Sequence, residues 1–116
     1  MNDSKVVFNG ENKMSELGDK RKKFTRLLAQ LITWIISQGY EVEIGQDGLK
    51  HMPGSLHFAG LAEDLLLFKD GTWLQNTEDY KFAGDYWITL DSDCRWGGNF
   101  STPDGDHFSI TFGGKS

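Results

Sequence analysis

The sequence predicts a single small α+β domain, in which two main helices pack against a central, largely antiparallel sheet. Its 116 residues suit one domain with one hydrophobic core. Residues 19–38 carry apolar side chains at helical spacing, and the short segments that follow are apolar or alternating and are separated by turn residues. A long helix followed by short strands and a second helix favours an α+β arrangement.

The first helix is expected to begin near Asp19 and to stop at Gly39. Its buried stripe consists of apolar residues at helical spacing: Phe24, Leu27, Leu28, Leu31 and Ile35, widened by Ile32 and Ile36. Residues 1–14 are polar without a clear period, so we expect a flexible arm there and a domain that covers residues 15–116.

Three strands and a loop are expected after this helix. Residues 40–44 (YEVEI) alternate as a half-exposed strand does, and residues 45–54 form a glycine-containing loop. Residues 65–68 (LLLF) predict a strand buried on both faces. The dipeptide Asp70-Gly71 predicts a hairpin turn, with a return strand through Trp73.

The last third of the chain predicts a second helix and a final strand. Thr77 can cap the helix, whose inward face would carry Ala83, Tyr86, Trp87 and Leu90. Residues 95–100 (RWGGNF) predict a turn in which the backbone comes close to a neighbour at its two glycines. Residues 107–112 (HFSITF) alternate as a strand.

Composition excludes several classes of function. A net charge of -5 and a pI near 5.0 argue against binding to nucleic acid or to an anionic membrane surface. The basic run Lys20 to Lys23 is expected to be a solvated helix face. The apolar segment Leu27 to Ile36 is too short to cross a bilayer, and the N-terminal residues lack the pattern of a signal peptide. We therefore expect a monomer made in the cytoplasm without stable membrane association.

The single cysteine, Cys94, rules out an intramolecular disulfide and fits folding in a reducing compartment. We expect it to be a buried structural residue, with a catalytic nucleophile as the alternative. The acidic residues Asp91 and Asp93 are expected in a solvated turn rather than in a second ion site, because too few oxygens cluster there for calcium.

Two histidines lie near acidic residues in a way that a metal site requires. His57 precedes Asp64, which stands at the head of the apolar strand, and Asp104 precedes His107 by three residues. A catalytic zinc typically has three protein ligands from His and Asp or Glu, and water in the fourth position. His57, Asp64 and His107 would form such a set.

A zinc site of this kind also needs a carboxylate that is not a ligand, to move the proton of the bound water. Asp104 is the candidate base, with Asp106 as the fallback, although strand alternation would direct Asp106 to the opposite face. Glu63 would face outward for the same reason. The alternative is that each histidine is an ordinary surface or hydrogen-bonded residue and that Asp104-Gly105 is only a turn.

The segments SLHFAGLAED (residues 55–64) and DGDHF (residues 104–108) resemble the signature of zinc peptidases that cut D-amino-acid-containing peptides of bacterial cell walls. This family includes the VanX and VanY D-alanyl-D-alanine peptidases and the L-alanyl-D-glutamate endopeptidases that bacteriophages use as endolysins. The likeness to small phage members extends over most of residues 15–112. It implies the VanX/VanY fold, also called the hedgehog/DD-peptidase type.

By this resemblance, His57, Asp64 and His107 would bind Zn²⁺, Asp104 would be the general base and Ser55 would lie near the substrate. Many relatives carry an arginine before the serine, whereas residues 40–57 contain none. A substitute for that arginine could be Lys50, His51 or Arg95, although lysine lacks the two-pronged donor geometry.

The resemblance implies a phage or prophage endolysin that hydrolyses the L-alanyl-D-glutamate bond of the peptidoglycan stem peptide. Such an enzyme would accumulate in the host bacterial cytoplasm and reach the wall after holin-type release. Two alternatives remain open: a D-alanyl-D-alanine carboxypeptidase or dipeptidase with the same site, and a catalytically inactive wall-binding module with the same fold.

Overall fold

The computed structural model describes residues 9–45 and 56–116, apart from the side chains of residues 9–15, 57 and 58. Its elements, in chain order, are α1 (Asn9–Ser37), β1 (Glu41–Ile44), α2 (Leu56–Ala59), β2 (Ala62–Lys69), β3 (Thr72–Trp73), the 3₁₀-helix η2 (Thr77–Tyr80), α3 (Lys81–Leu90), β4 (Cys94–Trp96), the 3₁₀-helix η3 (Gly97–Asn99) and β5 (His107–Ile110). The predicted α+β class, with two main helices and an antiparallel sheet, is confirmed.

The strands form one sheet in the order β1-β2-β5-β4, and β3 also pairs with β2. Each of these pairings is antiparallel. The register places Asp64 of β2 opposite His107 of β5, and Arg95 of β4 opposite Ser109 of β5. Because directly opposite residues project from the same face of a sheet, Asp64, His107, Ser109 and Arg95 share one face.

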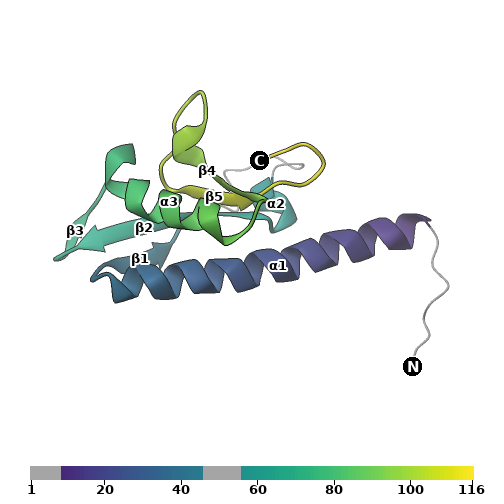
Figure 1. The fold of residues 1–116 in the computed structure, drawn as a ribbon, viewed down its shortest axis with the longest axis horizontal. Coiled ribbons are helices and arrows are strands. Elements are labelled where there is room, and N and C mark those ends of the chain that lie inside the picture. Colours follow the sequence, from purple (N-terminus) through teal and green to yellow (C-terminus); the bar gives the residue numbers. More distant parts are fainter. Residues whose placement is uncertain (1–8, 46–55) are drawn as a thin grey trace.

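The other face of the sheet carries the hydrophobic core. Leu65, Leu67, Phe108 and Ile110 are fully buried there. Helices α1 and α3 pack together and cover this core, and Trp87 of α3 makes an edge contact with the ring of Phe108. Figure 1 shows α1 lying lengthwise along the domain, with its N-terminal turns extending past the sheet. Asp64 and His107 therefore lie on the face that α1 and α3 do not cover, where His107 and Ser109 are nevertheless buried.

The hairpin between β2 and β3 forms as its turn residues predict. Asp70 and Gly71 both have positive φ values, 52° and 80°. Two successive residues in this region match the tight turn whose twist suits a two-residue hairpin, and Asn, Asp and Gly tolerate it best. The strand itself differs from the prediction, because Leu66 and Phe68 are only partly buried. On the core side of β2, Leu65 and Leu67 are fully buried, whereas Leu66 and Phe68 on the other side are not.

Several element boundaries differ from the predicted ones. Helix α1 begins at Asn9, earlier than the predicted start near Asp19, and residues 1–8 lie outside the described part. The added segment holds Glu11, Lys13 and Met14, which are good helix formers even without an apolar stripe. Thr77 begins a 3₁₀ turn, and α3 itself begins only at Lys81.

Strand β4 lies where a turn was predicted. Its three residues, Cys94–Trp96, are too few for an alternating pattern to be visible beside the two glycines that follow. The final strand is also shorter than predicted and ends at Ile110 rather than at Phe112. The predicted close backbone approach is confirmed, since a Cβ atom on Gly97 would overlap the carbonyl oxygen of Asp104.

Gly84 of α3 packs directly against the indole of Trp96. A Cβ atom at this position would overlap the ring, far inside contact distance. We expect Gly84→Ala to lower the free energy of unfolding by about 2 kcal/mol, because the rigid indole and the helix backbone must separate. Urea denaturation of both proteins measures this, and Gly18→Ala, in open space on α1, is the matched control. Equal midpoints for Gly84→Ala and Gly18→Ala would contradict this packing.

The basic run is not simply solvated, because two of its lysines pair with the acidic loop after α3. Lys20 Nζ lies 2.7 Å from Asp93 Oδ2, and Lys23 Nζ lies 3.0 Å from Asp91 Oδ1 and 3.2 Å from Asp93 Oδ2. These side chains are 26–32% exposed. The loop is thus tied to α1, and its carboxylates are neutralised by lysines of this chain.

These lysines also lower the pKa of Asp93 from its usual 3.8 to about 2. Because the folded-state pKa is the lower one, the ion pairs stabilise the fold above about pH 4 and lose this contribution as the pH falls toward 2. We expect Asp93→Asn to lower the free energy of unfolding by about 1 kcal/mol at pH 6 and by much less at pH 2. Thermal unfolding at both pH values tests this, and an equal difference at both would contradict it.

Candidate metal site

The candidate site lies on the face of the sheet opposite α1 and α3, where β2 and β5 pair. Asp64 follows Ala62 and Glu63 in β2, and His107 is the first residue of β5. Their direct pairing in the antiparallel register brings two residues distant in the sequence to one place. The His107 side chain is buried, and Asp64 is half-buried.

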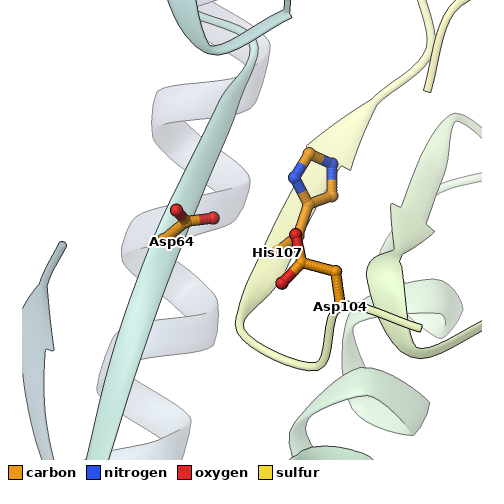
Figure 2. Close-up of side chains that lie close together, drawn as sticks. All are labelled: Asp64, Asp104 and His107. Atoms are coloured by element: carbon orange, nitrogen blue, oxygen red, sulfur yellow. The ribbon is translucent and has the colours of Figure 1, made fainter. Parts of the chain in front are cut away.

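Asp104 reaches this place through a tight loop before β5. Its backbone N–H donates to the carbonyl oxygen of Gly97 (2.9 Å), and its own carbonyl accepts from the N–H of His107 (3.2 Å). The absence of a side chain at Gly97 allows this approach, since a Cβ atom there would also lie 2.8 Å from His107 Cβ. Figure 2 shows the Asp104 carboxylate beside the His107 ring, with Asp64 facing both from the neighbouring strand.

Trp96 fixes the same loop from the core side. Its indole Nε1–H donates to the carbonyl oxygen of Gly105 at 2.7 Å, in a buried hydrogen bond. A Cβ atom on either Gly84 or Gly98 would clash with the indole, so the ring is held between these two glycines. The position of Asp104 therefore depends on the packing of α3 through a single rigid side chain.

Asp64, Asp104 and His107 each offer one ligand atom, and these atoms lie within 4.8 Å of one another. Such spacing allows all three atoms to reach a common metal ion. An imidazole nitrogen and carboxylate oxygens are ligands that Zn²⁺ accepts, and they do not by themselves select zinc over other divalent ions. The ring of Phe100 packs on the imidazole, with centroids 5.2 Å apart, and limits its orientation.

Asp106 belongs to the same group of side chains, contrary to the prediction that it points to the opposite face. Burial, the neighbouring carboxyl of Asp104 and the nearby charge of Asp64 together raise the pKa of Asp106 to about 7. Asp106 lies in the turn before β5, so the alternation of strand side chains does not apply to it.

The other predicted site residues are placed as follows. His57 lies in α2, which packs against β2. The side chain of His57 is outside the described part of the structure. Lys50, His51 and Ser55 also lie outside the described residues. Arg95 is exposed on the same sheet face as His107, and its Nη1 donates to the carbonyl oxygens of Ser92 and Cys94.

Glu63 and Cys94 lie on the core side of the sheet, away from the candidate site. Glu63 pairs with the buried Phe108, so it lies on the core side of β2, and one of its carboxylate oxygens is buried. The prediction that it faces outward is wrong. Cys94 is buried as predicted, and burial raises the pKa of its thiol to about 12. This argues against the alternative of a cysteine nucleophile.

The sequence pointed to Asp106 only as the fallback base and gave no role to Trp96. The proximity of Asp106 to His107 was visible, but its direction depends on a turn that the sequence does not specify. The signal for Trp96 was the pair of glycines that follow it, which indicated a close approach without naming the partner.

No family model matches this chain, and no curated protein matches it. Within residues 9–45 and 56–116, no helix is both long enough and apolar enough to cross a membrane.

Proposed function

We propose that this protein is a zinc-dependent peptidoglycan peptidase, of the endolysin type, that hydrolyses the L-alanyl-D-glutamate bond of the stem peptide. The observation that supports it most is the meeting of Asp64, Asp104 and His107, with ligand atoms within 4.8 Å of one another. These residues come from the two segments that resemble the cell-wall zinc peptidases. Two observations thus support the proposal: the resemblance of the two sequence segments, and the short distances among the three side chains.

In this proposal, Asp64 and His107 hold the zinc ion together with His57, which the motif places one turn before β2. The ion, when bound, would lower the pKa of a water ligand and polarise the scissile carbonyl. Asp104 is the general base, because it is exposed to incoming substrate and lies beside His107. Its carboxylate takes a proton from the water and delivers it to the leaving amine.

The surrounding residues hold Asp104 and the substrate. Asp106 neighbours Asp104 and would orient its carboxylate. Arg95 lies on the same face of the sheet as His107 and would meet a carboxylate of the substrate, as a substitute for the arginine that relatives carry earlier in the chain. Ser55 and His51 are proposed near the substrate on the motif alone. The partner is the stem peptide, met by a monomer after holin-type release from the host cytoplasm.

Digestion of purified peptidoglycan by the zinc-loaded protein tests this function. Mass spectrometry should find stem peptides that begin with D-glutamate, and these should be absent with Asp104→Asn. Release of terminal D-alanine, with the L-alanyl-D-glutamate bond intact, would show a carboxypeptidase instead. Wall binding by a zinc-loaded protein that cleaves no bond would point to an inactive binding module.

A further inference from the structure

Helix α2 lies outside the sheet, yet it carries His57, one of the three proposed zinc ligands. The sheet itself fixes the other two, because Asp64 and His107 pair directly in the register of β2 and β5. Asp64 is also held from the β1 side, where its carbonyl oxygen accepts from the N–H of Gly45 at 2.7 Å. A helix of one turn has little stability of its own, so the place of His57 depends on what holds α2 to the rest of the domain.

Two contacts hold α2 to the core and to β2. Leu56, its first residue, is buried in the hydrophobic core. The carbonyl oxygen of Leu56 accepts from the N–H of Leu61 at 2.8 Å, and this bond closes the helix just before β2. Gly60 lies within this turn with a φ of 80°, the left-handed conformation that glycine commonly adopts after a helix. The carbonyl of Ala59, the last residue of α2, still requires a donor from elsewhere.

Arg21 of α1 supplies that donor. Its Nε–H donates to the carbonyl oxygen of Ala59 at 2.6 Å, across 38 positions of the sequence. The stem of Arg21 lies along Gly60, where a Cβ atom would be 3.3 Å from Nε and 3.5 Å from Cγ. A charged donor makes a stronger hydrogen bond than a neutral one. Arg21 thus holds the C-terminal end of α2 by a charge-assisted bond and by packing on the adjacent glycine.

The part of α1 that carries Arg21 is itself fixed in the domain. Lys20 and Lys23, on either side of Arg21, pair with Asp93 at 2.7 Å and 3.2 Å. Phe24, in the next turn, is buried in the core. Arg21 therefore connects α2 to a firmly held segment and not to a free helix end.

We propose that Arg21 is a positioning residue for the metal site, which fixes α2 and thereby the place of His57 relative to Asp64 and His107. The inference rests on the proposed function, because it takes His57 to be the third zinc ligand. Its effect on zinc affinity has a sign that charge alone cannot produce. Removal of a cation would by itself strengthen the binding of Zn²⁺, whereas removal of this anchor weakens it.

The zinc affinities of four full-chain proteins test this role: the parent, Arg21→Met, His57→Ala and the double variant, each measured by competition with a chromophoric chelator. Methionine keeps the helix propensity of arginine but cannot donate a hydrogen bond. We expect Arg21→Met to weaken zinc binding about tenfold in the parent, and by less than about twofold when His57→Ala is already present. Arg21→Lys keeps a charged donor and should recover part of the loss. Arg26→Met is the matched control, exposed on the same helix, and should bind zinc at least as tightly as the parent.

Equal weakening by Arg21→Met in both backgrounds would indicate a general loss of stability and would overturn the positioning role, while the metal site stands. Parent-like zinc affinity in Arg21→Met or in His57→Ala would overturn it as well. If the parent binds no zinc, the proposed function fails, and amide hydrogen exchange of the metal-free proteins then decides whether Arg21 anchors α2. Several-fold faster exchange at the N–H of Leu61 in Arg21→Met than in Arg26→Met would support the anchor, and equal exchange would overturn it.

Discussion

Asp104→Asn is expected to reduce the rate of stem-peptide hydrolysis by roughly 10²–10⁴-fold while zinc stays bound, because a general base is lost. An amide of the same size cannot accept the proton of the water, but it keeps the shape of the loop. The loop has further support from the backbone bonds of Asp104 to Gly97 and His107 and from the bond of Trp96 to Gly105. Single-turnover hydrolysis of a synthetic stem peptide, with zinc content measured on the same samples, checks this.

The matched control for this change is Asp70→Asn, an exposed aspartate in the hairpin turn where Asn also tolerates the positive φ of 52°. It should hydrolyse the peptide as fast as the parent. Loss of zinc together with activity in Asp104→Asn would show that Asp104 is a ligand rather than the base. Full activity in Asp104→Asn would remove it from the chemistry altogether.

Asp64→Asn is expected to weaken zinc binding by at least about 100-fold, because the negatively charged oxygen ligand becomes a neutral amide. Activity at limiting zinc should fall in parallel, and excess zinc should restore part of it. Competition with a chromophoric chelator measures the affinity. Asp64 is half-buried at the start of β2, so the substitution also changes the packing of the fold. Thermal unfolding of the metal-free proteins separates this change in stability from the change in zinc affinity.

Glu43→Gln is the control for Asp64→Asn. Glu43 is exposed on the neighbouring strand β1, where it pairs with Leu66 of β2. The substitution Glu43→Gln removes one negative charge from the same sheet and leaves the candidate ligands unchanged, so the zinc affinity of this variant should match that of the parent. Equal zinc affinity for Asp64→Asn and Glu43→Gln would exclude Asp64 as a ligand.

The sequence predicted the class of the fold better than it predicted the contacts between its elements. The stripe from Phe24 to Ile35 specified the first helix because its period is strong, and Asp70-Gly71 specified the hairpin because few residues accept that turn. Asp64, Asp104 and His107 were chosen as chemically suited residues, and the structure brings these three together. Their actual meeting depends on the register of β2 and β5, which no local pattern contains.

The predictions that failed concern features set by tertiary contacts. Strand β4 has only three residues, and it is a strand because it pairs with β5. Asp106 turns toward Asp104 because the chain has not yet entered β5 at that residue. Lys20 and Lys23 meet Asp91 and Asp93 across the domain, and a charge count along the chain cannot show such pairs.

Crystals grown with zinc, with anomalous diffraction recorded on both sides of the zinc absorption edge, test the metal site most directly. The predicted result is one strong zinc peak within bonding distance of Asp64 and His107, with the Asp104 carboxylate beside a water on the ion. A fully formed domain with no peak at these residues, or with zinc held only elsewhere, would contradict the metal site and the peptidase mechanism that depends on it.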